Sequence, residues 1–332
     1  MRPTGEAPMP EVEATPDVTR PRVGISTCLL GENVRYDGGH ARDRFLTDTF
    51  GRFVEWVPVC PEVECGLPVP REAMRLVGDP ESPRLVTIDT RIDHTKRMKA
   101  WARRRVRELE SEDLAGFVFK SRSPSSGMER VKVYDDGGTP HRVGVGLWAR
   151  AFMDRFPLLP VEDEGRLHDP LLRENFIERL FCLKRYRDAV GGRRSRGALV
   201  TFHATHKLQV MAHSQKALKE MGRLVAHAKE RRTTDLFGRY EQLLMVAMAT
   251  KPTTGRHANV LLHALGYFKD ELSADEKREA LEVIDEYRGG FTPLIVPVTL
   301  VRHFVRKYGE PYLATQTYFN PHPIELKLRN HA

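Results

Sequence analysis

Three of the four cysteines lie within the first 65 residues, at spacings that suit a shared metal centre. Cys60 and Cys65 enclose the turn-prone segment Pro-Glu-Val-Glu, and Cys28 opens a glycine-rich loop. Three thiolates can hold three irons of a cubane cluster and leave the fourth iron open to a ligand. A structural zinc site would need a fourth protein ligand, for which His40 is available. These cysteines therefore predict a metal site, and free thiols in packed loops are the plainer alternative.

Polar side chains accompany the cysteines in the same loops. Glu62, two residues from Cys60, is a candidate general acid or base, and Ser123 and Ser125 are candidates to orient a water or a base edge. Each could instead be an ordinary solvated loop residue, and Asp37-Gly38 could be no more than a turn. The candidate contacts to a substrate base or phosphate are Arg35, Asp37, Lys120, Arg122 and Ser126.

Short β-branched segments lead into each of these loops. Residues 22–27, 53–59 and 114–119 are predicted strands, and residues 91–110 form a long charged helix pattern. Strands that alternate with helices predict an α/β fold, Rossmann-like, with a mainly parallel sheet. Ligands of such sheets bind beyond the carboxyl ends of the strands. We therefore expect the three loops to converge on one site.

The chain changes character near residue 165, where amphipathic helix patterns begin. Ser273 and Glu276 predict a capping box, and Gly289-Gly290 predicts a helix end. Cys182 falls in an apolar stripe and is predicted to be a buried core thiol. We expect a disordered lead-in at 1–20, a catalytic domain at 21–163 and a mainly α-helical domain at 164–332. The predicted helices cover 174–190, 197–230, 235–250, 257–272, 275–290 and 299–309.

The net charge of +8 lies entirely in the C-terminal part of the chain. Residues 191–332 hold 22 Lys and Arg against 14 Asp and Glu, whereas residues 1–190 are balanced. A basic half beside a neutral half suggests that one part performs chemistry and the other binds a polyanion such as a nucleic acid. An ordinary solubility charge is the alternative. The candidate phosphate contacts are Arg193, Arg194, Arg196, His206, Lys207, Arg302, Arg306 and Lys307.

Neither a secretory signal nor an apolar run of transmembrane length is visible in the sequence. Four cysteines in a chain of 332 residues are also too few for a secreted disulfide scaffold. We therefore expect a cytoplasmic protein that does not engage a membrane, and the sequence indicates no obligate protein partner.

Three segments, STCLLGENVRYDGG, VPVCPEVECGLPVPR and FKSRSPSSGMERVKVY, resemble motifs of the thiouracil desulfidase family. The resemblance covers roughly residues 22–160 and implies a catalytic [4Fe-4S] cluster. The helical remainder, which ends YFNPHPIELKLRNH, resembles the extension of longer members that look like tRNA 4-thiouridine desulfidases. It implies conversion of 4-thiouridine in tRNA to uridine with release of sulfide and no net redox change. An open iron would bind the sulfur of the thiolated uracil.

The chain departs from the family pattern at one ligand position. Short members usually read SPSCG where this chain has Ser126, and they usually lack a cysteine at the position of Cys65. We expect Cys65 to compensate, so that Cys28, Cys60 and Cys65 are the metal ligands. Otherwise two thiolates and the Ser126 oxygen remain. The alternative functions are desulfidation of free thiouracil or thiouridine nucleotides, and a redox-sensing iron–sulfur protein that binds nucleic acid.

Overall fold

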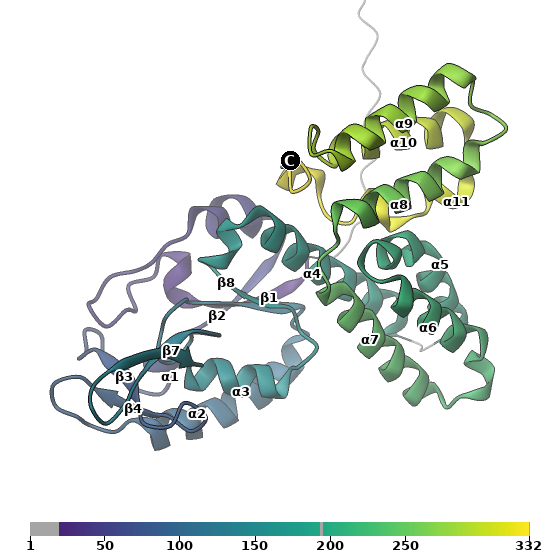
Figure 1. Cartoon of the computed structure of the whole chain (residues 1–332). Coiled ribbons are helices and arrows are strands. Elements are labelled where there is room, and N and C mark those ends of the chain that lie inside the picture. The colour runs from purple at the N-terminus through teal and green to yellow at the C-terminus, as the bar shows by residue number, and fades with distance from the viewer. Residues whose placement is uncertain (1–19, 193–194, 332) are drawn as a thin grey trace, which may run out of the picture.

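The computed structural model of the protein describes residues 20–192 and 195–331. The predicted disordered lead-in therefore lies outside the described residues, except for Arg20. Figure 1 shows an N-terminal α/β part and a C-terminal helical part, with helix α4 (Pro170–Val190) between them. This arrangement confirms the predicted fold class. Within the described residues, no helix is long and apolar enough to cross a membrane.

The main sheet contains four parallel strands in the order β2-β1-β5-β8. These are β1 (Arg22–Ser26), β2 (Glu55–Val59), β5 (Gly116–Phe119) and β8 (Val161–Asp163), so the three predicted strands and their parallel arrangement are confirmed. β5 is buried along its whole length, as is usual for a strand covered on both faces. Gly24 is required in β1, because a Cβ there would lie 2.1 Å from the ring of Phe117.

Helices cover both faces of this sheet. On one face, α3 (Leu147–Arg155) places Trp148 and Phe152 against Phe117, with ring centroids 6.0 and 4.7 Å from it. Helix α2 (Thr95–Glu108) packs beside α3 through Trp101, whose ring lies 5.0 Å from that of Trp148. On the other face, α4 contributes Phe176 and Leu180 to the core around β1. The predicted helix at 91–110 corresponds to α2. A sheet enclosed by two helical layers leaves the carboxyl ends of its strands as the accessible edge.

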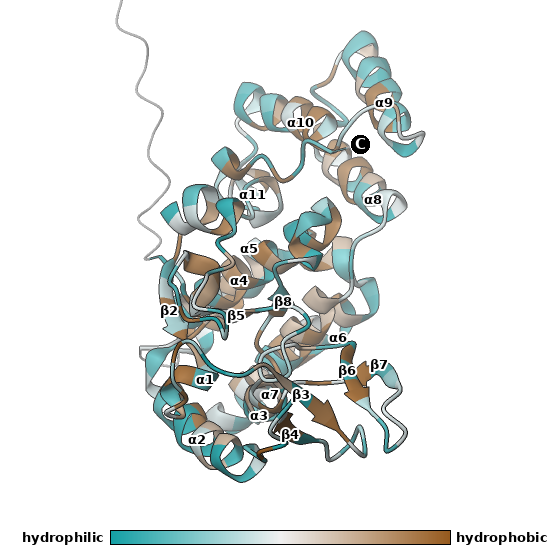
Figure 2. Ribbon diagram, turned by 90° about the vertical axis from the view of Figure 1, so that its left-hand side faces the viewer, coloured by the Kyte–Doolittle hydropathy of each residue, from teal (hydrophilic) through white to brown (hydrophobic). Residues whose placement is uncertain are grey.

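A second, smaller sheet that the sequence patterns did not predict lies beside the first. Its order is β4-β3-β6-β7, with a parallel central pair and antiparallel outer pairs. These strands are short, and basic residues such as Arg75, Arg84 and Lys132 interrupt them, so none shows a long apolar run, although β3 and β6 are hydrophobic overall (Figure 2). The strands are β3 (Met74–Val77), β4 (Arg84–Thr87), β6 (Val131–Tyr134) and β7 (Pro140–Gly144).

The C-terminal part consists of α4 and the helices that follow it. The predicted single helix at 197–230 is divided at Ser214, which has an extended backbone and whose side chain caps the next helix by accepting a hydrogen bond from the Ala217 N–H. The capping box of Ser273 and Glu276 and the helix end at Gly289 are confirmed, and Cys182 is fully buried. The helices are α5 (Arg196–His213), α6 (Gln215–Ala226), α7 (Thr233–Ala249), α8 (Thr254–Leu265), α9 (Ala274–Arg288), α10 (Ile295–Tyr308) and α11 (Pro311–Ala314).

A buried ion network joins the C-terminal tail to α4. The Arg329 side chain is 4% exposed and lies 3.1 Å from Glu174 and 3.8 Å from Glu178. It also donates a 2.7 Å hydrogen bond to the Tyr318 carbonyl. His213 lies 3.3 Å from the other carboxylate oxygen of Glu178. The arginine therefore compensates two carboxylates that have little access to water.

Replacing Arg329 by Ala is expected to lower the free energy of unfolding by about 3–5 kcal/mol, because the two carboxylates would stay buried without their cation. Urea unfolding followed by circular dichroism measures the change, and Lys327→Ala, at an exposed position two residues away, is the matched control. A loss for Arg329→Ala no larger than that of the control would show that the tail does not stabilise the fold through these charges.

Candidate active site

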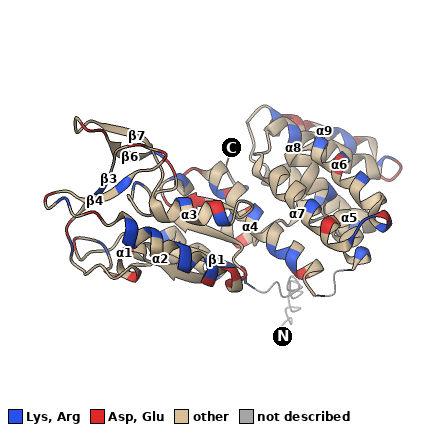
Figure 3. Cartoon of the chain, turned by 90° about the horizontal axis from the view of Figure 1, so that it is seen from below, with Lys and Arg blue, Asp and Glu red and all other residues tan. Residues whose placement is uncertain are grey.

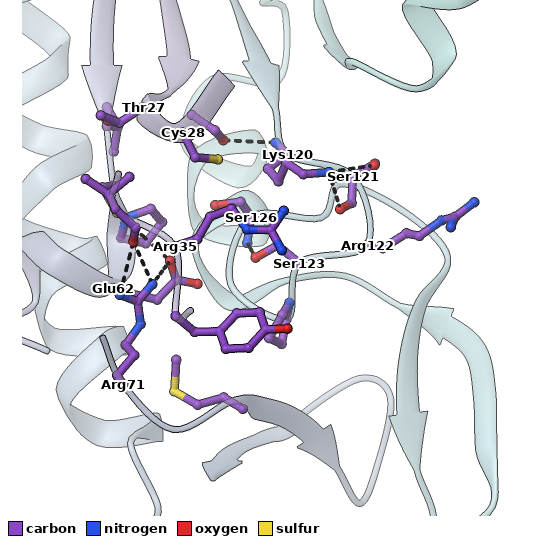
Figure 4. A pocket seen from close by; sticks show the side chains of 18 of the residues that line it. Thr27, Cys28, Arg35, Glu62, Arg71, Lys120, Ser121, Arg122, Ser123 and Ser126 are labelled. Atoms are coloured by element: carbon purple, nitrogen blue, oxygen red, sulfur yellow. Dashed lines mark hydrogen bonds and ion pairs between the residues drawn. The ribbon is translucent and has the colours of Figure 1, made fainter. Parts of the chain in front are cut away.

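The carboxyl ends of β1, β2 and β5 enclose a pocket of about 560 Å³. The loops that follow these strands, including the glycine-rich loop after β1, supply its walls (Figure 4). This confirms the prediction that the three loops converge on one site. Residues with thiol, charged or hydroxyl side chains that line it include Cys28, Arg35, Cys60, Glu62, Arg71, Lys120, Ser121, Arg122, Ser123 and Ser126.

Two thiols line this pocket. Cys28 lies in a short 3-10 helix, Thr27–Leu30, that begins where β1 ends. Cys60 follows β2 and precedes helix α1 (Pro61–Glu64), whose first position is a proline, as is favourable at a helix start. Burial raises the pKa of Cys28 to about 11 and that of Cys60 to about 12. Both are therefore protonated at neutral pH without a metal, and a metal would have to displace their protons.

The third predicted ligand, Cys65, does not reach the pocket wall. Its Sγ lies 3.3 Å from the Glu62 carbonyl oxygen, and its side chain belongs to the hydrophobic core. The intervening turn of α1 separates it from Cys60 by about 140° around the helix axis. No group of three or more His, Cys, Asp or Glu side chains among the described residues is placed to hold a metal ion. We therefore correct the ligand prediction: the three-cysteine set is not assembled, nor is a zinc site with His40.

Ser126 faces the pocket in the position that Cys65 was expected to fill. It is 3% exposed, and its backbone N–H donates a 3.1 Å hydrogen bond to Ser123 Oγ. The serine loop packs closely against the start of α3, where a Cβ on Gly146 would lie 2.3 Å from the Ser125 carbonyl oxygen. The donor set around the pocket is thus two soft thiols and one harder hydroxyl. These are the donors that the pocket offers to an iron–sulfur cluster, and they are a poorer set for iron than three thiolates.

Glu62 is held by hydrogen bonds on both carboxylate oxygens. Ser125 donates to Oε1, and Arg71 donates to Oε2 at 3.1 Å. Because the Ser125 proton is used in this way, the 3.0 Å contact between Ser123 and Ser125 has Ser123 as its donor. Cys60 Sγ lies 4.0 Å from Glu62 Oε2. Glu62 is therefore an oriented carboxylate between the serine loop and a candidate metal ligand.

The structure separates the two serines that were candidates to orient a water or a base edge. Ser125 is fully buried and is not part of the pocket wall, so it positions Glu62 rather than a substrate. Ser123 lines the pocket. The sequence analysis missed Arg71, which pairs with Glu62 and also donates to the Val34 carbonyl at 3.1 Å. Its only signal was its place at the end of the second family motif, because one arginine after a proline is usually solvated.

The predicted substrate contacts have mixed outcomes. Arg35 and Lys120 line the pocket, but Arg35 pairs with Asp37 at 3.2 Å, and Lys120 pairs with Glu164. Asp37 itself lies off the wall and accepts a 3.0 Å hydrogen bond from the Gly39 N–H, so it serves the turn that was the alternative for this segment. Arg122 is exposed at the pocket wall.

Few of the residues predicted to contact phosphate in the helical part have an exposed and unpaired positive charge. His206 is buried and stacks on Phe202 at 3.8 Å, and burial lowers its pKa to about 3, so the prediction that it contacts phosphate is wrong. Arg196 donates to the carbonyls of Ala228 and Arg231, both at 2.9 Å. Lys307 pairs with Glu276. Lys207 and Arg306 are exposed, Arg302 is half-buried, and Arg193 and Arg194 lie outside the described residues.

Comparisons with known proteins match the two parts of the chain separately. Residues 23–164 match the family model of 2-thiouracil desulfurase, and residues 207–323 match a family described as a protein of unknown function, DUF1722. The uncharacterised protein YbgA of Escherichia coli is 32% identical over 137 residues, which are 41% of this chain and 81% of YbgA. A solved structure described as the [4Fe-4S]-dependent thiouracil desulfidase TudS is 28% identical, with a TM-score of 0.37, and the match covers 45% of this chain and 94% of that one.

The family match identifies residues 23–164 as a domain similar to 2-thiouracil desulfurase. A mostly helical domain follows it in the same chain. The chain belongs to the family of YbgA, which it matches over 137 residues.

Proposed function

We propose that this protein is a [4Fe-4S]-dependent desulfidase that converts 4-thiouridine in tRNA to uridine. The supporting observation is one pocket in which two thiols and a hydroxyl face the oriented carboxylate of Glu62. The reaction is a hydrolysis: the C4–S bond breaks, a bond from C4 to the oxygen of water forms, and sulfide leaves. No electrons are gained or lost.

Cys28, Cys60 and Ser126 would hold the cluster, since they are the donors that line the pocket. When bound, the cluster supplies a Lewis acid for the substrate sulfur. The hydroxyl ligand is a weaker donor to iron than a thiolate is, so we expect a cluster that is lost more readily than one with three cysteines.

Glu62 accepts a proton from the attacking water as a general base. Arg71 and Ser125 hold its carboxylate in place, because both donate hydrogen bonds to it. Ser123, which lies on the pocket wall, is placed to contact the base or the water. Proton transfer by a positioned side chain contributes about 10²–10⁴ to the rate of such reactions.

The charge of the chain supports tRNA as the substrate, because the positive excess lies in the part that follows the desulfidase domain. A thiouridine within folded tRNA must be unstacked before it can enter the pocket, and contacts to the tRNA body would offset that cost. The second candidate substrate is free thiouracil, which the description of the matched family names.

Anaerobic reconstitution with iron and sulfide, followed by nucleoside analysis of treated bulk tRNA, tests the proposal. We expect absorbance of the cluster in the visible region, loss of 4-thiouridine from the tRNA, an equal gain of uridine, and release of sulfide. A cluster-loaded protein that desulfurises free thiouracil but leaves tRNA intact would support the second candidate. A loaded protein that desulfurises neither would contradict the assigned chemistry.

A further inference from the structure

A groove of about 580 Å³ adjoins the active-site pocket, and Met74, Ser121, Arg122 and Pro124 line both. The outer face of the small sheet forms much of its floor. A ligand that fills the pocket can therefore continue into the groove without leaving the protein surface.

Cationic side chains dominate this groove. The only acidic residues that line it are Glu129 and Asp163. Arg166 is neutralised by Glu129 at 2.9 Å and Glu162 at 2.7 Å. The five other basic residues that line the groove form no ion pair with any carboxylate among residues 20–192 and 195–331. These five, which we call the groove cations, are Arg75, Arg122, Arg130, Lys132 and Arg142.

Three groove cations form a row across adjacent strands. Lys132 in β6 is the cross-strand partner of Arg142 in β7. Arg75 in β3 precedes Leu76, which pairs with Val133, so Arg75 lies beside Lys132. Figure 3 shows the strands β3, β4, β6 and β7 that form this sheet. Like charges directly opposite one another destabilise a sheet, so this row costs stability unless an anion binds it.

Arg75 offers hydrogen-bonding capacity that the protein does not use. Its Nε is buried and has no hydrogen-bond partner among the described residues. Its guanidinium group lies 4.7 Å from the centre of the Tyr134 ring, which orients it along the groove. A planar guanidinium with free N–H groups matches the oxygens of a phosphate.

The remaining two groove cations lie on either side of the serine loop. Arg122 and Arg130 have φ angles of 60° and 51°. This left-handed conformation is unfavourable for a residue with a long side chain and would suit glycine better. The chain thus carries arginine at two strained positions that border the entrance from the groove to the pocket.

We propose that this groove binds the phosphodiester backbone of the RNA strand next to the nucleotide that enters the pocket. The proposal rests on the proposed function, because the pocket would hold the thiolated base to which that strand is attached. Phosphate contacts give affinity that is independent of sequence and falls with salt. In the helical part, by contrast, some cations are already paired with carboxylates, such as Arg239 with Glu220 and Lys307 with Glu276.

Binding of bulk tRNA to the full-length protein, measured by fluorescence anisotropy between 50 and 300 mM KCl, tests this inference; these concentrations span the range over which phosphate contacts weaken. The test variant replaces Arg75, Lys132 and Arg142 by Gln. A second variant changes only the exposed Lys132 and Arg142, in case the half-buried Arg75 is needed for folding. The control replaces three exposed cations of α2 that have no ion pair with a described residue, namely Lys96, Arg103 and Arg107.

We expect the triple variant to bind tRNA about tenfold or more weakly, with the slope of log affinity against log salt reduced by about 2. We also expect its turnover of thiouridine in tRNA to fall relative to its turnover of the free nucleoside. Unchanged affinity and slope, or an equal loss in the control, would overturn the inference. Failure of the proposed function looks different: the unaltered protein would bind tRNA through the groove and leave its thiouridine intact.

Discussion

Glu62→Gln is expected to lower the turnover of thiouridine by about 10²–10⁴-fold while the cluster stays in place. The amide keeps the shape of the side chain and can still accept the hydrogen bond from Ser125, but it cannot take a proton from water. Arg71 would lose its only charged partner among the described residues, at a side-chain distance of 3.1 Å. Single-turnover kinetics at matched cluster content, read from iron and sulfide analysis, measures the effect.

Glu32→Gln is the matched control for this prediction. Glu32 is an exposed carboxylate in the glycine-rich loop and does not line the pocket. Its replacement should change turnover by less than twofold, on the order of the small effects seen for surface residues. Full activity in cluster-loaded Glu62→Gln would remove Glu62 from the reaction.

Removing either pocket thiol is expected to abolish the cluster and all measurable turnover. Cys28→Ala or Cys60→Ala leaves one thiol and one hydroxyl on the pocket wall, which is too few soft ligands for an iron–sulfur cluster. Cys65→Ala should instead keep the cluster absorbance and the activity, because its side chain packs in the core and not at the pocket. Iron content and visible absorbance after anaerobic reconstitution distinguish these outcomes.

Ser126→Cys provides the converse test. It restores a third thiol at the pocket wall and should slow the loss of cluster in air or in the presence of a chelator, because thiolate is the preferred ligand. If Cys65→Ala lost the cluster while Ser126→Ala kept it, the ligand set predicted from the sequence would be right. The arrangement in the structure would then have to change when metal binds.

Several features of the fold follow from local sequence. The three segments that end at Cys28, Cys60 and the serine loop are apolar and β-branched, and the chain between them returns through a helix, so a parallel sheet with its loops at one edge was predictable. The capping box at Ser273 is likewise a local pattern. These predictions depend on the type of each residue and on the spacing between neighbours.

The small sheet could not be predicted in this way. Its strands contain four or five residues, and the central pair joins β3 to β6, which are more than fifty residues apart in the chain. The groove cations come together only through that pairing. The buried ion network of Arg329 has the same origin, because its partners on α4 lie about 150 residues earlier.

The sequence by itself determined that this chain carries a cysteine- and serine-lined site at the end of a parallel sheet and a basic helical domain after it. The tertiary structure alone decided which side chains reach that site. One turn of helix directs Cys65 into the core, the return of the chain after Pro70 brings Arg71 to Glu62, and helix packing buries His206. Residue types reveal what chemistry is available, whereas side-chain direction depends on contacts between segments that are distant in the chain.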